Sequence, residues 1–489
     1  MAEPAIVIIG AGPAGVRAAQ ALADAGIRPI VIDEGRRSGG QIYRRQPDGF
    51  TRSHATLYGT EAERARALHT CFDGLEGRVD YRPETLVWHI SDGQVWTLGP
   101  DGHQSIPYDA LILCTGATDR LMPVRGWHRA GTYSLGGSQI ALKAQACAIG
   151  SQVVFLGSGP LLYLVAAQYV KAGAHVAAVL DTAPFAARIP ALPKLLAQPA
   201  ALWNGVLLTR TIKRAGVPIL HGVTPLDITG GEEGSGAPDG AGVDTGPAAR
   251  DGRSSSRAGT VDTGAVSGVT VRTADGGERH FACDAIAMGH HLRPETQLAD
   301  LARCAFAFDP AVRQWLPVRD PDGRASVPGV YLAGDGARIL GARSAEASGR
   351  LAALAALTDL GFPVASVDLA SLRRDVATYV RFASGLAQAF PWPVEQAAAL
   401  PDDAIVCRCE SITAGELRAT VTDTGAQEAN RAKAFSRVGM GRCQGRYCGL
   451  AAAEVIAAAA AIPVERVGRL RSAAPVKPIS AGSAGKAGA

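Results

Sequence analysis

Ile6-Val-Ile-Ile-Gly-Ala-Gly-Pro-Ala-Gly15 joins a β-branched apolar run directly to three closely spaced glycines. The run is typical of a buried strand, and the alanine-rich residues from about Val16 to Ala25 are typical of a helix. Gly10 permits the tight turn between them, Gly12 lets the backbone approach a pyrophosphate, and Gly15 lets the helix pack against the strand. The free N–H groups of the helix N-terminus would then bind the phosphates. The expected contacts of this dinucleotide site are Gly10, Gly12, Pro13, Ala14 and Gly15.

Two further stretches extend this site. A second strand, Pro29-Ile-Val-Ile-Asp-Glu34, ends in carboxylates about twenty residues later, where a ribose hydroxyl is held in such sites. Either Asp33 or Glu34 fills this role, and the sequence leaves both open. The paired-glycine loop Ser38-Gly-Gly-Gln-Ile-Tyr43 is either a flexible turn or a backbone that passes close to a flat ring system. Its position favours the second interpretation, with Gly40 and Gln41 as contacts.

Composition excludes several classes of protein. The 489 residues suffice for two or three domains with sizeable cores. A net charge of +4 gives no basic face for nucleic acid. The first strand begins too early to leave room for a signal peptide, and no apolar run of about eighteen residues predicts a membrane span. Four of the nine cysteines lie in one short C-terminal region, which favours metal binding in a reducing, cytoplasmic compartment.

A second dinucleotide unit begins at Val153-Val-Phe-Leu-Gly-Ser-Gly-Pro-Leu-Leu162 and continues to a strand over Val176–Asp181. Gly157 and Gly159 match the motif, but Leu162 replaces the third glycine. Leucine there narrows the phosphate site, so the sequence predicts the fold of this unit but not tight nicotinamide binding. The slot is left open to NAD(P), an adenine nucleotide or nothing. Residues from about 230 to 268 lack large apolar side chains and are predicted to form a disordered loop.

Two later strands end in small polar motifs. Ala110-Leu-Ile-Leu-Cys-Thr-Gly116 ends in Thr115 and Gly116, and Gly329-Val-Tyr-Leu-Ala-Gly-Asp335 ends in Gly334 and Asp335. An aspartate at the end of a buried strand is costly unless it is hydrogen-bonded. The hydroxyl-rich ribityl chain of a flavin is its natural partner. The helix expected over Ala345–Leu357 would direct its N-terminus at the same group, whereas His290 and His291 are expected to be loop residues at a domain edge.

In this order, these motifs resemble the two-dinucleotide-domain flavoproteins, a family that includes thioredoxin reductase and glutathione reductase. The resemblance covers about Ala5 to Gly361 and implies an α/β fold of two nested Rossmann-like domains, with FAD in the first and the second inserted into it. Disulfide reductases of this family need a reactive cysteine pair beside the flavin. Residues 39–44 contain no cysteine and Cys147 stands alone, so a thiol–disulfide reductase is excluded. Electrons must leave the flavin by another route.

A cysteine module near the C-terminus offers that route. Cys407-Arg-Cys409 and Arg442-Cys-Gln-Gly-Arg-Tyr-Cys448 each precede an expected helix start, at Thr413-Ala-Gly-Glu416 and at Gly449. Helix N-termini stabilise thiolates. Structural zinc usually uses wider Cys spacings, so a 2Fe–2S cluster is favoured over zinc. The stretch resembles the bacterioferritin-associated ferredoxin-like module, and this resemblance implies four ligands: Cys407, Cys409, Cys443 and Cys448.

A flavoprotein with this C-terminal module resembles one narrower group. It comprises the A or α subunits of opine oxidases and of D-hydroxyproline and related proline dehydrogenases, and the FAD subunit of hydrogen cyanide synthase. Residues 39–44 and 441–448 carry the resemblance. It implies a partner subunit, similar to glycine and D-amino-acid oxidases, that takes hydride from a C–N bond, with or without a third small subunit. Electrons would then go to a quinone or respiratory-chain acceptor, with at most peripheral membrane association through the complex.

The expected organisation has six segments: 1–125 and 296–362 as the FAD domain, 126–295 as the inserted domain, 363–400 as a helical linker, 401–472 as a helical 2Fe–2S module, and 473–489 as a disordered tail. The expected function is electron transfer in a heteromeric oxidoreductase that oxidises an amino acid, imino acid or opine, with no catalytic base in this chain. One alternative is the FAD subunit of hydrogen cyanide synthase, which acts on glycine. The others are a self-sufficient NAD(P)H-dependent reductase, against which Leu162 counts, and a subunit with vestigial cofactors.

Overall fold

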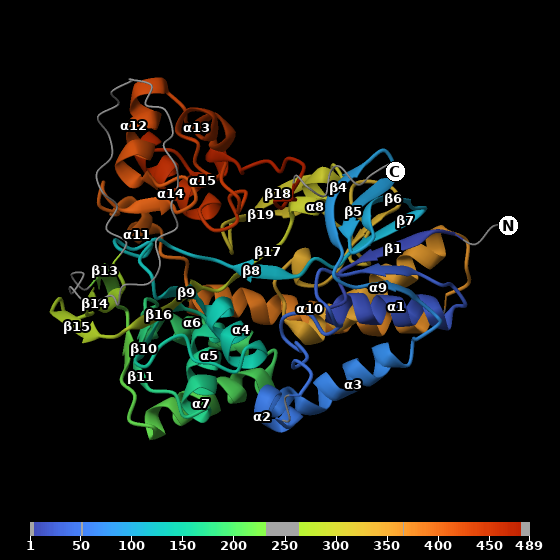
Figure 1. Ribbon diagram of the computed structural model, residues 1–489, viewed down its shortest axis with the longest axis horizontal. Helices are drawn as coiled ribbons and strands as arrows, with labels where there is room; N and C mark the ends of the chain where they lie inside the picture. Colours follow the sequence, from blue (N-terminus) through green and yellow to red (C-terminus); the bar gives the residue numbers. More distant parts are fainter. Residues whose placement is uncertain (1–3, 50–51, 231–263, 365, 481–489) are drawn as a thin grey trace, which may run out of the picture.

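The computed structural model describes residues 4–49, 52–230, 264–364 and 366–480 (Figure 1). Within these residues it has the predicted α/β fold, with two five-stranded parallel sheets and a small helical unit near the C-terminus. The predicted loop at about 230–268 falls mainly on residues 231–263, which lie outside the described part. The final residues, 481–489, also lie outside it.

The first sheet joins strands from distant parts of the chain. Its order is β20-β7-β1-β2-β3, and all neighbouring pairs are parallel. β1 lies at its centre and is buried throughout, as expected for a parallel sheet covered on both faces. The strands are β1 (Ile6–Ile9), β2 (Ile30–Ile32), β3 (Asp80–Arg82), β7 (Ala110–Leu113) and β20 (Val330–Leu332).

Different layers cover the two faces of this sheet. One core contains side chains of α1, α3 and α9, and the other contains side chains of an antiparallel three-stranded sheet and of α8. α1 and α9 approach very closely, because a Cβ at Gly349 would lie 2.0 Å from the carbonyl oxygen of Ala14. The elements are α1 (Pro13–Asp24), α3 (Ala62–Asp73), β4 (Leu86–Ser91), β5 (Gln94–Gly99), β6 (Gly102–Pro107), α8 (Gln297–Leu301) and α9 (Ala342–Asp359). α2 (His54–Tyr58) precedes α3, with η1 (Gly59–Glu61) between them.

The second sheet has the order β12-β11-β10-β16-β9 and is likewise parallel. Helices α4, α5 and α7 cover one face, and an antiparallel sheet of β13–β15 covers the other. The strands are β9 (Thr132–Ser134), β10 (Val153–Ser158), β11 (Val176–Asp181), β12 (Ile219–His221), β13 (Thr224–Gly230), β14 (Val266–Arg272), β15 (Glu278–Ala282) and β16 (Ala285–His290). The helices are α4 (Leu135–Ala144), α5 (Pro160–Lys171), α6 (Arg188–Leu195) and α7 (Pro199–Arg214), with η2 (Phe185–Ala187) before α6.

Short strands and one long helix connect the two units. β8 (Ala117–Asp119) pairs with β17 (Leu292–Pro294) between the sheets, and β18 (Phe306–Asp309) pairs with β19 (Gln314–Pro317). α10 (Ser366–Ala389) packs against α9 of the first unit and α6 of the second.

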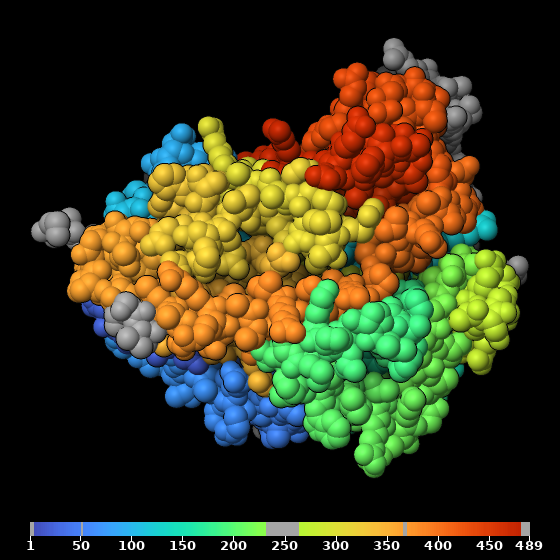
Figure 2. Space-filling model, turned by 180° about the vertical axis from the view of Figure 1, so that it is seen from behind, coloured from blue at the N-terminus to red at the C-terminus, as the bar shows by residue number. Residues whose placement is uncertain are grey.

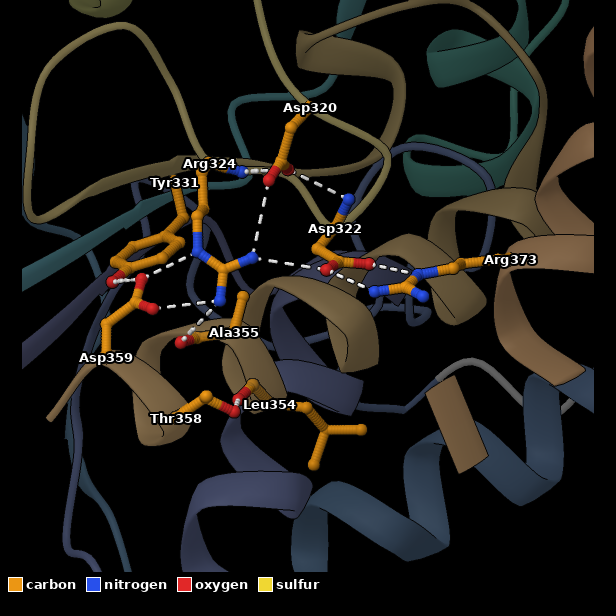
Figure 3. Close-up of polar contacts among 9 residues, drawn as sticks. All are labelled: Asp320, Asp322, Arg324, Tyr331, Leu354, Ala355, Thr358, Asp359 and Arg373. Atoms are coloured by element: carbon orange, nitrogen blue, oxygen red, sulfur yellow. Dashed lines mark hydrogen bonds and ion pairs between the residues drawn. The ribbon is translucent and has the colours of Figure 1, made fainter. Parts of the chain in front are cut away.

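A polar network fixes α10 to the first unit (Figure 3). Both Asp322 carboxylate oxygens accept hydrogen bonds of 2.6 Å from Arg373 of α10, while Arg324 bonds to Asp322 and to Asp359 of α9. The Arg373 guanidinium lowers the pKa of Asp322 below its usual range. Asp322 is only 7% exposed, whereas the Arg373 side chain is 46% exposed, so solvent screens this bidentate pair from the side of α10.

The C-terminal unit is a small helical body with its own alanine-rich core. Its helix α12 (Ala414–Thr424) carries the predicted capping box, in which Thr413 and Glu416 bond to each other's backbone N–H. The helix expected after Cys448 is α14. The elements are α11 (Val394–Ala398), β21 (Ile405–Cys407), β22 (Ile412–Thr413), α12 (Ala414–Thr424), α13 (Ala429–Ser436), α14 (Gly449–Ala460) and α15 (Val464–Val467).

After α15 the chain returns to the first unit as a strap of residues 469–477. Arg469 forms a bidentate ion pair with Asp300, and Val476 is 2% exposed and bonds to the Trp88 carbonyl. Two residues of the segment expected to be a disordered tail contact the first unit: Val476 is buried there, and Lys477 forms an ion pair with Glu34. In the described part of the chain, no helix is long and apolar enough to cross a bilayer.

Candidate functional site

The turn between β1 and α1 requires glycine, because the backbone turns tightly at Gly10 and the helix packs close to the strand at Gly15. Gly10 has φ +105°, and a Cβ there would lie 2.3 Å from the Cys114 carbonyl oxygen. A Cβ at Gly15 would lie 1.8 Å from the Gly10 carbonyl oxygen. The paired-glycine loop crosses this turn, since a Cβ at Gly40 would lie 2.9 Å from Cα of Gly12. Two glycine-rich segments, the turn at residues 10–15 and the paired-glycine loop, therefore lie against each other. They leave a surface of backbone that fits a diphosphate and the adjoining ring system.

The two carboxylates after β2 point to different partners. Asp33 accepts hydrogen bonds from the backbone N–H of Ala11, at 2.5 Å, and of Gly35, at 2.6 Å. Glu34 instead forms an ion pair with Lys477 of the strap. Burial raises the pKa of Asp33 despite these two donors. Asp33 is therefore the carboxylate that faces the glycine turn.

The ends of β7 and β20 meet beside this turn. A Cβ at Gly336 would lie 2.4 Å from Oγ1 of Thr115, and one at Gly334 would lie 2.9 Å from Cβ of Ala14. Oδ1 of Asp335 accepts the backbone N–H groups of Leu340 and Gly341, at 2.8 and 2.9 Å. No described residue bonds to Oδ2, and burial raises the pKa of Asp335. This oxygen is available to a hydroxyl donor at the N-terminus of α9.

Gln41 and Lys143 flank the paired-glycine loop. Gln41, a predicted contact, is exposed and accepts a hydrogen bond from Arg44. Lys143 of α4 is 8% exposed, and its Nζ lies 3.5 Å from the Ile42 carbonyl oxygen. Burial lowers the pKa of Lys143 to about 8. The sequence analysis missed this lysine because it lies in the other unit and belongs to no motif.

The four cysteines of the C-terminal unit come together although about thirty residues separate the two pairs. Cys407 ends β21 and Cys448 caps α14, and both are buried, whereas Cys409 is exposed. The Cys448 thiol donates to Cys407 and to Cys443, and Cys443 is also hydrogen-bonded to Cys409. Donation by Cys448 lowers the pKa of Cys407 to about 6 and that of Cys443 to about 5.

Two thiols with lowered pKa values are suited to metal binding, because the thiolate is the ligand. Within the described ranges, no three Cys, His, Asp or Glu side chains are arranged as a site for a metal ion. A 2Fe–2S cluster has two irons and four cysteine ligands, so its thiolates need not surround one point. The donor set, four cysteines beside the N-terminus of α14, fits such a cluster.

A buried ion pair connects this cysteine loop to the first unit. Arg446, between Cys443 and Cys448, binds Glu295 at 2.8 Å, and the two side chains are 9% and 12% exposed. The Glu295 backbone bonds to Thr115 and Gly116, which follow β7. Its N–H donates to the Gly116 carbonyl at 2.9 Å, and its carbonyl accepts from Thr115 Oγ1 at 2.5 Å. No sequence motif marks Glu295, because its role arises only from packing.

The second unit has a closed nucleotide slot. Asp181, at the end of β11, is fully buried and accepts hydrogen bonds from the Tyr163 hydroxyl at 2.5 Å and from Arg188 at 2.7 Å. Its carboxylate is therefore already occupied where a ribose would bind. At the glycine turn, a Cβ at Gly159 would lie 3.1 Å from the His291 ring, while Gly157 has φ +139°.

The segment after α10 lies over this slot. The Phe390 carbonyl bonds to Nε2 of His291 at 2.8 Å, and its ring lies 4.9 Å from the Arg188 guanidinium carbon. His290 is fully buried in β16 beside Trp392, rather than in a loop as the sequence predicted. The loop prediction was wrong for His290, because β16 extends to this residue, whereas His291 lies between β16 and β17.

Two family models match the chain. The model described as pyridine nucleotide-disulphide oxidoreductase matches residues 4–352, and the BFD-like [2Fe-2S] binding domain matches residues 405–458. The two matches identify the cofactors of the two sites as FAD and a 2Fe–2S cluster.

Curated relatives match over nearly the whole length. The A subunit of opine oxidase from Agrobacterium tumefaciens is 35% identical, over 97% of this chain and 90% of that protein. The HcnB subunit of hydrogen cyanide synthase from Pseudomonas protegens is 28% identical, over 90% of this chain and 89% of that protein. Among solved structures, the L-proline dehydrogenase of P. horikoshii has the same fold, with a TM-score of 0.67 and 17% identity over 98% of this chain and 79% of that one.

Proposed function

Since the chain belongs to the pyridine nucleotide-disulphide oxidoreductase family, in the group that includes opine oxidase A subunits, we propose that it is the electron-transfer subunit of a heteromeric enzyme. The enzyme is an FAD-dependent oxidoreductase that acts on the C–N bond of an amino acid, imino acid or opine. Its relatives are named as subunits, which supports a complex of several chains.

Residues of the first unit hold FAD in this proposal. The bare turn at Gly10, Gly12 and Gly15 receives the diphosphate, and Asp33 receives the ribose because it faces that turn while Glu34 pairs with the strap. Oδ2 of Asp335 accepts a ribityl hydroxyl. The remaining proposed contacts are Pro13, Ala14, Gly40, Gln41, Thr115, Gly116 and Gly334.

The four cysteines of the C-terminal unit bind the cluster in this proposal. When bound, FAD stores two electrons, and a 2Fe–2S cluster passes one at a time. The chain's own residues orient the two sites, because Glu295 is hydrogen-bonded to Thr115 and Gly116 and ion-paired with Arg446 of the cysteine loop. This buried connection is the observation that carries the proposed relay.

The closed slot of the second unit counts against the self-sufficient NAD(P)H reductase. The Asp181 carboxylate is satisfied by Tyr163 and Arg188, and Phe390 lies over them. A nicotinamide nucleotide would have to displace these contacts. We therefore assign Gly157 and Gly159 a structural role, as the turn residues of a slot that the chain itself fills.

Substrate oxidation belongs to a second subunit in this proposal, one similar to glycine and D-amino-acid oxidases. This chain contributes no catalytic base. Electrons leave the cluster for a quinone or another respiratory acceptor.

The test is to express the chain alone and together with an oxidase-like subunit similar to glycine and D-amino-acid oxidases. Each preparation is then screened for dye reduction with glycine, prolines and opines. We expect turnover only in the complex, and no flavin bleaching when NADH is added anaerobically to the chain alone. Robust oxidation of a secondary amine by the isolated chain would contradict the division of labour, and NADH bleaching would favour the reductase alternative.

A further inference from the structure

The second unit carries an apolar surface that neither cofactor site uses. Thirteen large apolar side chains are exposed in the described residues, and seven of them lie within residues 185–207. Scattered exposed apolar residues are normal, but such a concentration in one short segment marks an interaction surface.

The exposed side chains follow the helical repeat of α6. Ile189, Leu192 and the C-cap residue Leu196 are spaced by three and four residues, so they share one face, and exposed Phe185 lies just before them in η2. The opposite face, with Ala191 and Leu195, packs against α10. A surface helix normally turns polar side chains outward, whereas α6 is apolar on both its inner and its outer face.

α7 continues the same surface. Its Leu202 packs into the cluster formed by α6 and α10, which places the start of α7 beside α6. The outward side chains of α7 are Trp203, which is 61% exposed, Val206 and Leu207. Seen from behind, this green segment forms an outer face next to α10 in orange (Figure 2).

The charged side chains of this surface are all basic. Residues 182–226 contain five Arg and Lys but no Asp or Glu. Arg188 turns inward to Asp181, and Lys194 donates to Gln388. The other three, Arg210, Lys213 and Arg214, are exposed at the end of α7 and form no ion pair with the described residues.

We propose that the α6–α7 face binds an anionic lipid bilayer. Apolar and aromatic side chains on helices that also carry lysine and arginine are typical of surfaces that lie in the headgroup region. The apolar residues would enter the acyl boundary while Arg210, Lys213 and Arg214 contact anionic headgroups. The absence of carboxylates from residues 182–226 removes the repulsion that such a surface would otherwise meet. This inference does not depend on the electron route.

The test uses the full chain with its cofactors and phosphatidylcholine vesicles prepared with and without phosphatidylglycerol. We expect flotation with the anionic vesicles, weakened by salt. The substitutions Arg210→Glu, Lys213→Glu and Arg214→Glu together should weaken binding by at least about tenfold. Arg303→Glu, Arg466→Glu and Arg471→Glu change the net charge equally on other surfaces and should leave binding intact.

Trp203 gives a second readout. Brominated lipids should quench its fluorescence on vesicle binding, and Trp203→Phe should remove that quenching without releasing the protein. If the wild-type chain fails to float with anionic vesicles, the proposal is overturned. It is also overturned if Ile189→Ser with Trp203→Ser abolishes association with the partner subunit or self-association but leaves vesicle binding unchanged, since the face would then be a protein interface.

Discussion

At the scale of single residues, Glu295 and Arg446 matter most for the account. Their side chains are only 9% and 12% exposed, they are oppositely charged, and they lie between the two cofactor sites. Removing one partner of a buried ion pair leaves the other charge uncompensated. Glu295→Gln should therefore lower the melting temperature, by an amount that corresponds to about 3–5 kcal/mol, and slow the reduction of the cluster after flavin reduction.

Thermal unfolding and stopped-flow absorbance measure these two effects. Glu278→Gln is the control, because its ion pair with Arg272 is 58% and 51% exposed and should be worth about 0–1 kcal/mol. Equal behaviour of the two variants would show that Glu295 has no positioning role.

His290 predicts a pH dependence of stability. Burial lowers its pKa from 6.5 to about 3, and neither ring nitrogen has a partner among the described residues. In the unfolded chain His290 binds a proton below pH 6.5, whereas in the folded chain it stays neutral down to about pH 3. Its contribution to stability is therefore fully present above pH 6.5 and is lost as the pH falls through this window. His290→Phe should flatten the change of melting temperature between pH 7 and 5, whereas exposed His175→Gln should not.

At the scale of elements, the packing of α1 on α9 supports the nucleotide turn. Gly349→Ala would place a Cβ 2.0 Å from the Ala14 carbonyl oxygen, so one helix must move. We expect lower FAD content after purification and a lower melting temperature. Gly205→Ala in α7 is the matched control, because open space surrounds that position. It should stabilise the helix by about 0.5–1 kcal/mol, and a comparable loss of FAD in both variants would contradict the role of this contact.

The elements also explain what could be predicted from the sequence. Gly10, Gly15 and the capping box at Thr413 follow from local backbone geometry, and local geometry leaves a local sequence pattern. Glu295, Lys143 and Phe390 act through contacts between units, and such contacts leave no pattern at any fixed spacing. The strap was missed for the same reason, since the burial of Val476 depends on Trp88, which is far away in the sequence.

At the scale of the whole molecule, the strap holds the C-terminal unit on the FAD unit. Arg469 pairs with Asp300, the Val476 carbonyl accepts from Arg446, and Lys477 pairs with Glu34. A chain ending at Ser472 should keep both cofactors. Trypsin, which cleaves after Lys and Arg, should however cut its C-terminal unit faster. Limited proteolysis with intact and truncated chains measures this. Arg469 and its ion pair with Asp300 remain in the truncated chain, so equal cleavage rates would show that residues 473–477 do not help to fix the unit.

In the proposed relay, the second slot and the cysteine unit together set the direction of electron flow. The slot where a nicotinamide nucleotide would enter is filled by the chain's own side chains, and the cysteine unit lies at the other end of the Glu295–Arg446 connection. The molecule retains the two-domain flavoprotein fold, and in the proposed relay its flavin site is connected to a cluster bound by the four cysteines.

Anaerobic stepwise photoreduction of the isolated chain, followed by EPR and visible absorbance, tests this relay most directly. The account predicts that the EPR signal of a reduced 2Fe–2S cluster appears before the flavin is fully reduced. In Cys443→Ser this signal should be lost while FAD is retained. A chain that contains zinc without acid-labile sulfide, or a cluster that stays oxidised while the flavin is fully reduced, would contradict it.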